Sequence, residues 1–234
     1  MDGKFISTLL PQCGWSDIPC ITLQTVLNMT GIYSSVTLEK STYITSAISG
    51  SITKGMEICG EDKSGVIVML DGEGMRILTD STVTISNMTV CINATTSFES
   101  LSTSSLESTQ SVPPIFFVCH TGTGALTVSN VSFTSLPPSL IPLTQPLIES
   151  TTGTLMLSSV SFNYISTEGV PLVSISGKAF MINNGSEFTS VTTGNGSGGI
   201  VDVHVEERVN ISGVTFTKCV NDNQDSLNIA SLYI

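Results

Sequence analysis

The residues best suited to acid–base chemistry lie in the segment VDVHV, at positions 201–205. Asp202 and His204 alternate there, so both side chains would lie on one face of an extended strand. A carboxylate beside an imidazole is a combination that general acid–base catalysis uses. The same alternation would send Val201, Val203 and Val205 into a core and leave the polar pair in solvent. We favour this second interpretation.

Other candidate groups do not form a recognisable catalytic pattern. Asp71, Glu73 and Asp80 cluster around Gly72, whereas Glu206 and Glu207 follow the VDVHV segment. The two arginines, Arg76 and Arg208, lie beside no regular row of acids. The sequence contains no G-x-S-x-G motif, and GNGSGG at 194–199 is not followed by the Lys-Ser/Thr of a phosphate-binding loop. We therefore expect no catalytic site and no cofactor.

The cysteines indicate an oxidising compartment better than they indicate a metal site. There are six, an even number, without a C-x-x-C pair, and the chain has only two histidines, so we expect no metal. Cys13 and Cys20 are close enough in sequence to form a local disulfide. The other four, which could pair between neighbouring repeats or fill the core, are Cys59, Cys91, Cys119 and Cys219.

Sequons for N-glycosylation are a second indication of a secreted or surface-exposed protein. The seven N-x-S/T sites begin at Asn28, Asn87, Asn93, Asn130, Asn184, Asn195 and Asn210. We favour Asn28, Asn93, Asn195 and Asn210 as acceptors. The remaining three occupy repeat corners, where inward-pointing, stacked amides could not carry sugar.

Composition restricts the classes of partner. The chain has 234 residues, of which 12% are charged, and 19 Asp and Glu against 8 Lys and Arg give a net charge of −11. This acidity argues against nucleic acid and against electrostatic binding to an anionic membrane. No apolar run is long enough to span a bilayer. The candidate partners are carbohydrate, other surface proteins and neighbouring segments of a longer chain.

The elements that would position these residues are copies of one short pattern. The segment ALTVSNVSF at 125–133 is repeated around residues 81–90, 154–162, 179–188 and 208–216. The last four copies end on Phe133, Phe162, Phe188 and Phe216. Between its two alternating halves each copy has a small residue or Asn, which predicts a left-handed corner. The predicted corner residues are Asn87, Asn130, Ser159, Asn184, Gly185 and Gly213.

An opening strand precedes each of the later copies, in PIFFV, PLIES, PLVSI and GIVDV at 114–118, 146–150, 171–175 and 199–203. Three short strands per repeat predict an all-β fold, a right-handed parallel β-helix whose coils stack at about 4.8 Å. A β-sandwich and a β-propeller are the rival folds, and sandwich strands need short hairpin turns of the Asn-Gly kind, of which Asn184-Gly185 is the best of very few. Earlier strands are expected at 36–44, 52–59 and 66–70, with Gly60 and Gly72 in turns.

The domain organisation follows from this pattern. Residues 1–30 form a lead-in and a capping helix over 19–30, for which a helical turn in a surface loop is the alternative. Residues 31–234 form the β-helix, with loop insertions near 95–113 and 134–145 on one edge. The terminal SLNIASLYI, at 226–234, has the pattern of another coil. We expect the chain to be a segment of a longer protein.

Two further features resemble known proteins. Gly198-Gly199-Ile200 followed by ISGVTFTKC at 211–219 is similar to the repeats of polymorphic outer-membrane and autotransporter adhesins. The opening CGW…PCITLQ, at 13–24, resembles large β-helical surface proteins of protists. Both groups have the pectin lyase-like right-handed β-helix. The resemblance implies an extracellular or cell-surface scaffold or adhesion segment of a glycoprotein. Because that superfamily also contains polysaccharide lyases and glycoside hydrolases, such an enzyme is the alternative.

Overall fold

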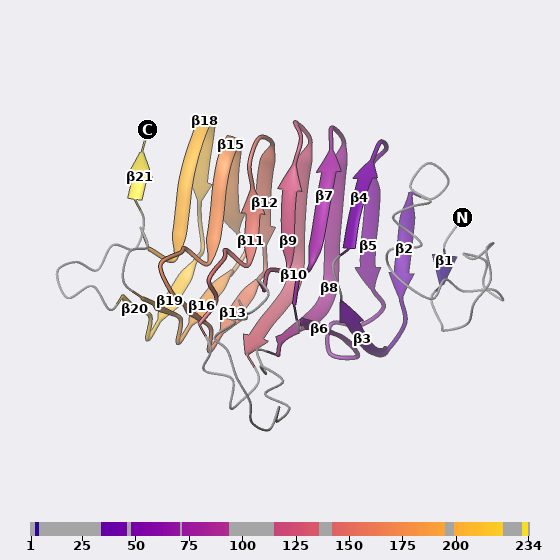
Figure 1. The fold of residues 1–234 in the computed structure, drawn as a ribbon, viewed down its shortest axis with the longest axis horizontal. Helices are drawn as coiled ribbons and strands as arrows, with labels where there is room; N and C mark the ends of the chain where they lie inside the picture. Colours follow the sequence, from indigo (N-terminus) through magenta and orange to yellow (C-terminus); the bar gives the residue numbers. More distant parts are fainter. Residues whose placement is uncertain are drawn as a thin grey trace, which may run out of the picture.

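The computed structural model describes residues 3–4, 34–45, 48–70, 72–93, 115–135, 142–194, 199–221 and 231–233. These residues form β-strands and no helix. The predicted capping helix at 19–30 lies outside them. The strands succeed one another along the long axis of the molecule, from β2 near the N-terminus to β21 near the C-terminus (Figure 1). The protein is thus a parallel β-solenoid.

Three strand columns run along the solenoid, and four long strands pass from one column into the next. The first column, which contains the predicted opening strands, comprises β4 (Ile48–Ile52), β7 (Met75–Thr79), β9 (Val118–Thr121), β11 (Ile148–Ser150), the first halves of β15 (Val173–Asn183) and β18 (Val201–Ile211), and β21 (Ser231–Tyr233). The second comprises β1 (Gly3–Lys4), β2 (Ser35–Leu38), β5 (Met56–Gly60), the first halves of β8 (Thr82–Ile92) and β10 (Ala125–Ser135), β12 (Thr154–Ser158), and the second halves of β15 and β18. The third comprises β3 (Ser41–Thr45), β6 (Val66–Leu70), the second halves of β8 and β10, β13 (Ser161–Asn163), β16 (Glu187–Thr189) and β19 (Thr215–Thr217).

All pairings among the described strands are parallel, as stacked coils require and as a sandwich or propeller of antiparallel strands does not allow. A small fourth column, which the sequence did not predict, consists of β14 (Ser166–Thr167), β17 (Thr192–Thr193) and β20 (Val220–Asn221). The expected strands at 36–44 and 52–59 are each divided by a corner. Gly60 ends β5 rather than lying in a turn, and Gly72 lies in a bend.

The predicted corners are confirmed. Asn87, Asn130, Ser159 and Asn184 have φ between 52° and 57°, and Gly213 has a φ of 62°. Each corner lies between two alternating halves, so apolar residues on both sides of it face inward. Phe133, Phe162, Phe188 and Phe216 consequently stack, with successive ring centroids 4.8 Å apart. These rings form the central ladder of the core.

The predicted insertions fall mostly outside the described residues, at 94–114 and 136–141. The two gaps begin close to one another, because Ile92, one residue before the last described residue of its segment, is the Cα partner of Ser135 in the β8–β10 ladder. Thr134 and Ser135 belong to β10, and Leu143 forms a bridge with Thr167. Both connections therefore leave the solenoid at the same edge.

Candidate functional site

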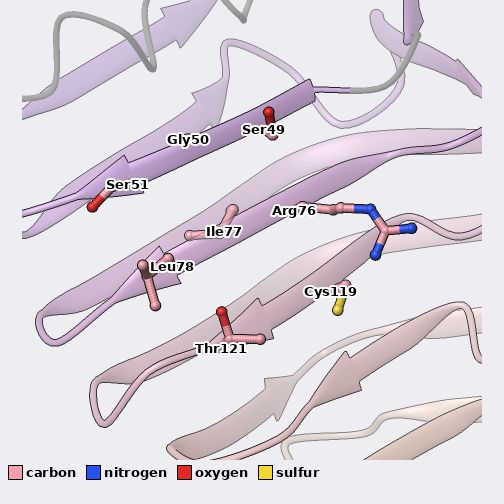
Figure 2. Close-up of a pocket in the computed structure, with 8 residues that line it drawn as sticks. All are labelled: Ser49, Gly50, Ser51, Arg76, Ile77, Leu78, Cys119 and Thr121. Atoms are coloured by element: carbon pink, nitrogen blue, oxygen red, sulfur yellow. The ribbon is translucent and has the colours of Figure 1, made fainter.

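The outward side of the first column carries several side chains that could take part in chemistry. In order of coil, one outward row contains Ser49, Arg76, Cys119, Glu149, Ser174 and Asp202. Near its N-terminal end lies a hollow of about 430 Å³. Figure 2 shows this hollow, in which the Arg76 side chain extends towards Cys119 while Leu78 and Thr121 lie farther along the strands. The lining is mainly apolar, and Leu78 is 51% exposed.

Arg76 contacts two neighbouring side chains. Its Nε lies 3.5 Å from a carboxylate oxygen of Glu73, and its guanidinium carbon lies 4.6 Å from the centroid of the Phe116 ring. Both side chains of the ion pair are partly exposed, so the pair itself adds little to stability. The predicted acidic cluster around Gly72 is therefore a set of local contacts, and its third member, Asp71, lies outside the described residues.

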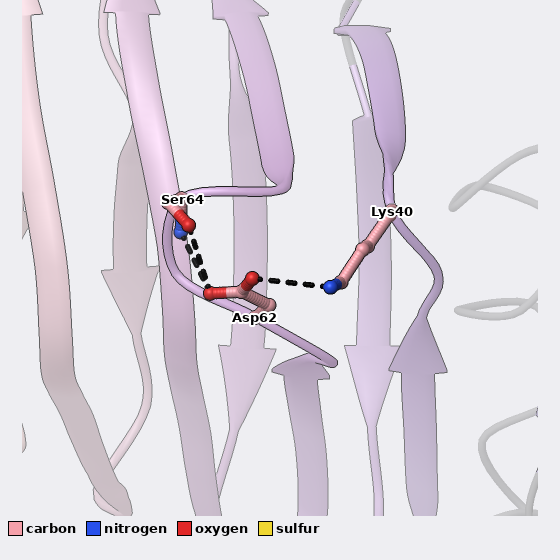
Figure 3. A network of polar contacts seen from close by, with 3 residues as sticks. All are labelled: Lys40, Asp62 and Ser64. Atoms are coloured by element: carbon pink, nitrogen blue, oxygen red, sulfur yellow. Dashed lines mark hydrogen bonds and ion pairs between the residues drawn. The ribbon is translucent and has the colours of Figure 1, made fainter.

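Asp80 also has a structural role. Its Oδ1 accepts hydrogen bonds from the backbone N–H and the hydroxyl of Thr123, at 3.0 and 2.9 Å. These hydrogen bonds lower the pKa of Asp80, which keeps the carboxylate ionised. An equivalent arrangement occurs at Asp62, which accepts two hydrogen bonds from Ser64 and lies 3.3 Å from Lys40 Nζ (Figure 3). Both carboxylates stabilise bends between strands.

The Cys119 thiol is poorly suited to nucleophilic catalysis. Its Sγ lies 3.5 Å from Oε2 of Glu149 in the next coil. Burial and the negative charge of Glu149 raise the pKa of Cys119 to about 11, and Arg76 offsets this only in part. Because the thiolate is the reactive form, Cys119 stays unreactive near neutral pH.

The predicted acid–base pair lies on the surface. His204 Nε2 is 3.1 Å from Asp202 Oδ1, and the histidine side chain is 52% exposed. Val201 and Val203 are buried behind them, as the alternation predicted. Among the described residues no three His, Cys, Asp or Glu side chains are grouped as a metal site requires. The described part of the chain also contains no helix long and apolar enough to cross a membrane.

The corner amides differ from the sequence expectation. They stack between coils, but on the outside: the Asn130 amide donates to Asn87 Oδ1, and the Asn184 amide donates to Ser158 Oγ at 2.9 Å. Asn130 and Asn184 are exposed. Among the favoured acceptors, Asn93 and Asn210 are partly exposed, whereas Asn28 and Asn195 lie outside the described residues. Glycosylation of all four stays a prediction.

The cysteines within the described residues are unpaired. Cys59, Cys91, Cys119 and Cys219 are all free thiols, so the option of disulfides between neighbouring coils is not realised there. Cys59, Cys91 and Cys119 lie on strands and have no cysteine opposite them in register. Cys91 is buried, and Cys219, which follows β19, packs against the core. The predicted Cys13–Cys20 disulfide lies outside the described residues and remains a prediction.

The burial of His120 was not predicted from the sequence, where the residue was considered only as a possible metal ligand. The imidazole is fully buried, and its Nδ1 lies 2.8 Å from the hydroxyl of Ser150. Val118 is a core residue of the same strand, so strand alternation predicts that the His120 side chain also faces the core.

Comparisons of the chain with protein-family models, with curated proteins and with solved structures found no match.

Proposed function

We propose that this protein is a scaffold or adhesion segment of an extracellular or cell-surface glycoprotein, built on a right-handed parallel β-helix of the pectin lyase-like kind. The main support is the outward side of the second column. Over four successive coils it presents an uncharged row, namely Thr84, Thr127, Met156 and Met181, and over the last three of these coils a second one, namely Ser129, Ser158 and Asn183. A regular, uncharged surface of this kind suits contact with carbohydrate or with another protein.

A neighbouring coil is the second kind of partner that we propose. In the coil of β18 and β19, apolar residues are exposed at positions that are buried in the preceding coil. Ile211 is 47% exposed, whereas its Cα partner Ile182 is 2% exposed. Val220 is likewise 50% exposed. A further coil, from a longer parent chain, would cover these apolar side chains and pair with the strand edges.

The alternative, a polysaccharide lyase or glycoside hydrolase, has one supporting observation. Glu149 and Asp202 share the outward row of the first column with Ser174 between them, so their backbones are about 10 Å apart at two inter-strand spacings. Inverting glycosidases place their two carboxyl groups at about 6.5–9.5 Å. However, Glu149 contacts Cys119 and Asp202 contacts His204, which favours the scaffold.

The test uses the chain produced through a secretory pathway and applied to glycan arrays and to cell surfaces. The variant Thr127→Arg places a charge in the centre of the uncharged rows, and Thr134→Arg, on the third column, is the matched control. We expect binding that Thr127→Arg abolishes and Thr134→Arg leaves intact. Release of sugar fragments from polysaccharides, lost in Glu149→Gln or Asp202→Asn, would overturn the scaffold and establish the enzyme.

A further inference from the structure

Among the described residues, the buried histidine His120 has a position with a consequence for stability. His120, in β9, is completely buried and faces inward, between Ile77 of β7 and Ser150 of β11 in the ladder register. Its Nδ1 and the Ser150 hydroxyl are 2.8 Å apart. Its Nε2 is buried and has no hydrogen-bond partner among the described residues.

Either neutral tautomer leaves one imidazole nitrogen incompletely satisfied, but the cationic form is less favourable still. An imidazolium has two N–H donors, and here Nε2 forms no hydrogen bond in the structure, the nearby backbone carbonyl of Thr79 being an uncharged group that cannot act as a counter-ion. Burying a charge that lacks a counter-ion costs far more than burying a neutral polar group. Burial therefore destabilises the protonated form of His120 more than it destabilises the neutral form.

Within the described ranges, the side chains that face the imidazole carry no compensating charge. Strand β7 presents Ile77 and Thr79, and β11 presents Ser150, to the same interior. The adjoining bends contribute the backbone of Gly122, Gly124 and Gly153, where a Cβ on Gly153 would lie 2.8 Å from the imidazole Cε1. The nearest acids along these elements face outward: Asp80 bonds Thr123, and Glu149 contacts Cys119.

We propose that His120 makes the solenoid acid-sensitive, so that the stack between β9 and β11 loosens once the pH falls below about 6.5, the range in which an unfolded histidine takes up a proton. Because each coil contacts mainly its neighbours, the loosening starts at this boundary and need not involve the whole chain. The device would respond to the acidification that a surface or secreted protein meets during uptake into acidic compartments.

The direction follows from proton linkage. Burial lowers the pKa of His120 in the folded state, and the nearby backbone carbonyl of Thr79 offsets part of that effect. The unfolded chain therefore binds the proton first as the pH falls. The contribution to stability is complete above the unfolded pKa and is lost as the pH decreases from there towards the folded pKa.

The test compares the wild-type chain with His120→Asn, whose amide can replace Nδ1 but cannot take up a proton, and with His204→Asn as the exposed control. Between pH 7.5 and 5.0 the wild type and His204→Asn should lose about 3–5 °C in Tm, relative to His120→Asn, for each unit by which burial lowers the pKa. An equal pH dependence in all three proteins would overturn the proposal.

A second measurement keeps the test valid if His120→Asn folds poorly. Hydrogen exchange of the wild type at the two pH values follows the Thr151 amide, bonded to the His120 carbonyl, and the Ser190 amide, bonded to the Thr217 carbonyl. After correction for intrinsic rates, protection at Thr151 should fall at pH 5.0 while protection at Ser190 is kept. Unchanged protection at Thr151, or equal loss at both amides, would contradict local loosening.

Discussion

At the scale of single residues, the corners determine the path of the chain. Asn87, Asn130 and Asn184 adopt left-handed backbone conformations, which Asn tolerates better than most side chains do. Ser159 adopts the same conformation in the intervening coil without that advantage. The Asn side chains add hydrogen bonds between coils. Each Asn therefore has both a conformational and a bonding role.

Replacement of Asn130 should separate these two roles. Asn130→Ala should lower the free energy of unfolding by about 1–2 kcal/mol, because alanine is strained at a φ of 52° and the amide hydrogen bond to Asn87 is lost. Asn130→Gly removes the same hydrogen bond without the strain and should cost less. Urea denaturation measures both variants. An Asn130→Gly chain less stable than Asn130→Ala would contradict the assigned conformation.

The Cys119 thiol gives a prediction about pH. Its rate of alkylation, followed by mass spectrometry, should rise with pH towards an inflection near 11. At pH 8 the reaction should be on the order of 100-fold slower than that of an unperturbed thiol, because so little thiolate is present. Glu149→Gln should lower the pKa and speed the reaction, whereas Glu168→Gln, at an exposed site, should not. An inflection near 8.5 that is insensitive to Glu149→Gln would contradict the described contact.

At the scale of elements, alternation was sufficient to predict much of the fold. The opening strands, the corner residues and the phenylalanine anchors all follow from apolar residues at every second position, interrupted by one corner. A second set of corners was missed. Tyr164, Ser190 and Lys218 have φ near 55°, yet they share no chemical property that marks such a conformation in a sequence.

The candidate site was less predictable than the fold. Strand alternation correctly placed Asp202 and His204 outside the core, because both belong to one strand. The contact between Cys119 and Glu149 joins residues 30 positions apart, so it depends on the register between coils, which varies with loop length. The burial of His120 was missed because histidine was weighed only in the argument against a metal site, whereas its position in the strand indicated the core.

The phenylalanine ladder yields a prediction about element packing. Phe162 is fully buried between two stacked rings, whereas Phe216 is partly exposed and stacks on Phe188 alone among the described rings. Phe162→Ala should lower the free energy of unfolding by about 3–5 kcal/mol and Phe216→Ala by about 1–2 kcal/mol. Urea denaturation of the two variants checks the ratio. Equal losses would show that Phe216 is as enclosed as Phe162.

At the scale of the whole molecule, the solenoid separates structural residues from those available for recognition. In the described part of the chain, the interior contains the apolar ladders, His120 and a few hydroxyl side chains, and the outside presents hydroxyls, amides and scattered acids. The free energy of folding then comes largely from contacts between neighbouring coils along the whole axis. Such a molecule can present a long regular surface along its axis.

The most direct test of this account is a crystal structure of the chain produced through a secretory pathway. We predict parallel coils in which Phe133, Phe162, Phe188 and Phe216 stack at 4.8 Å, with Asp202 and Glu149 on the outer surface and no third acid beside them. Antiparallel pairing of these strands would contradict the fold. Carboxylates from three successive coils that converge on one groove would contradict the scaffold function.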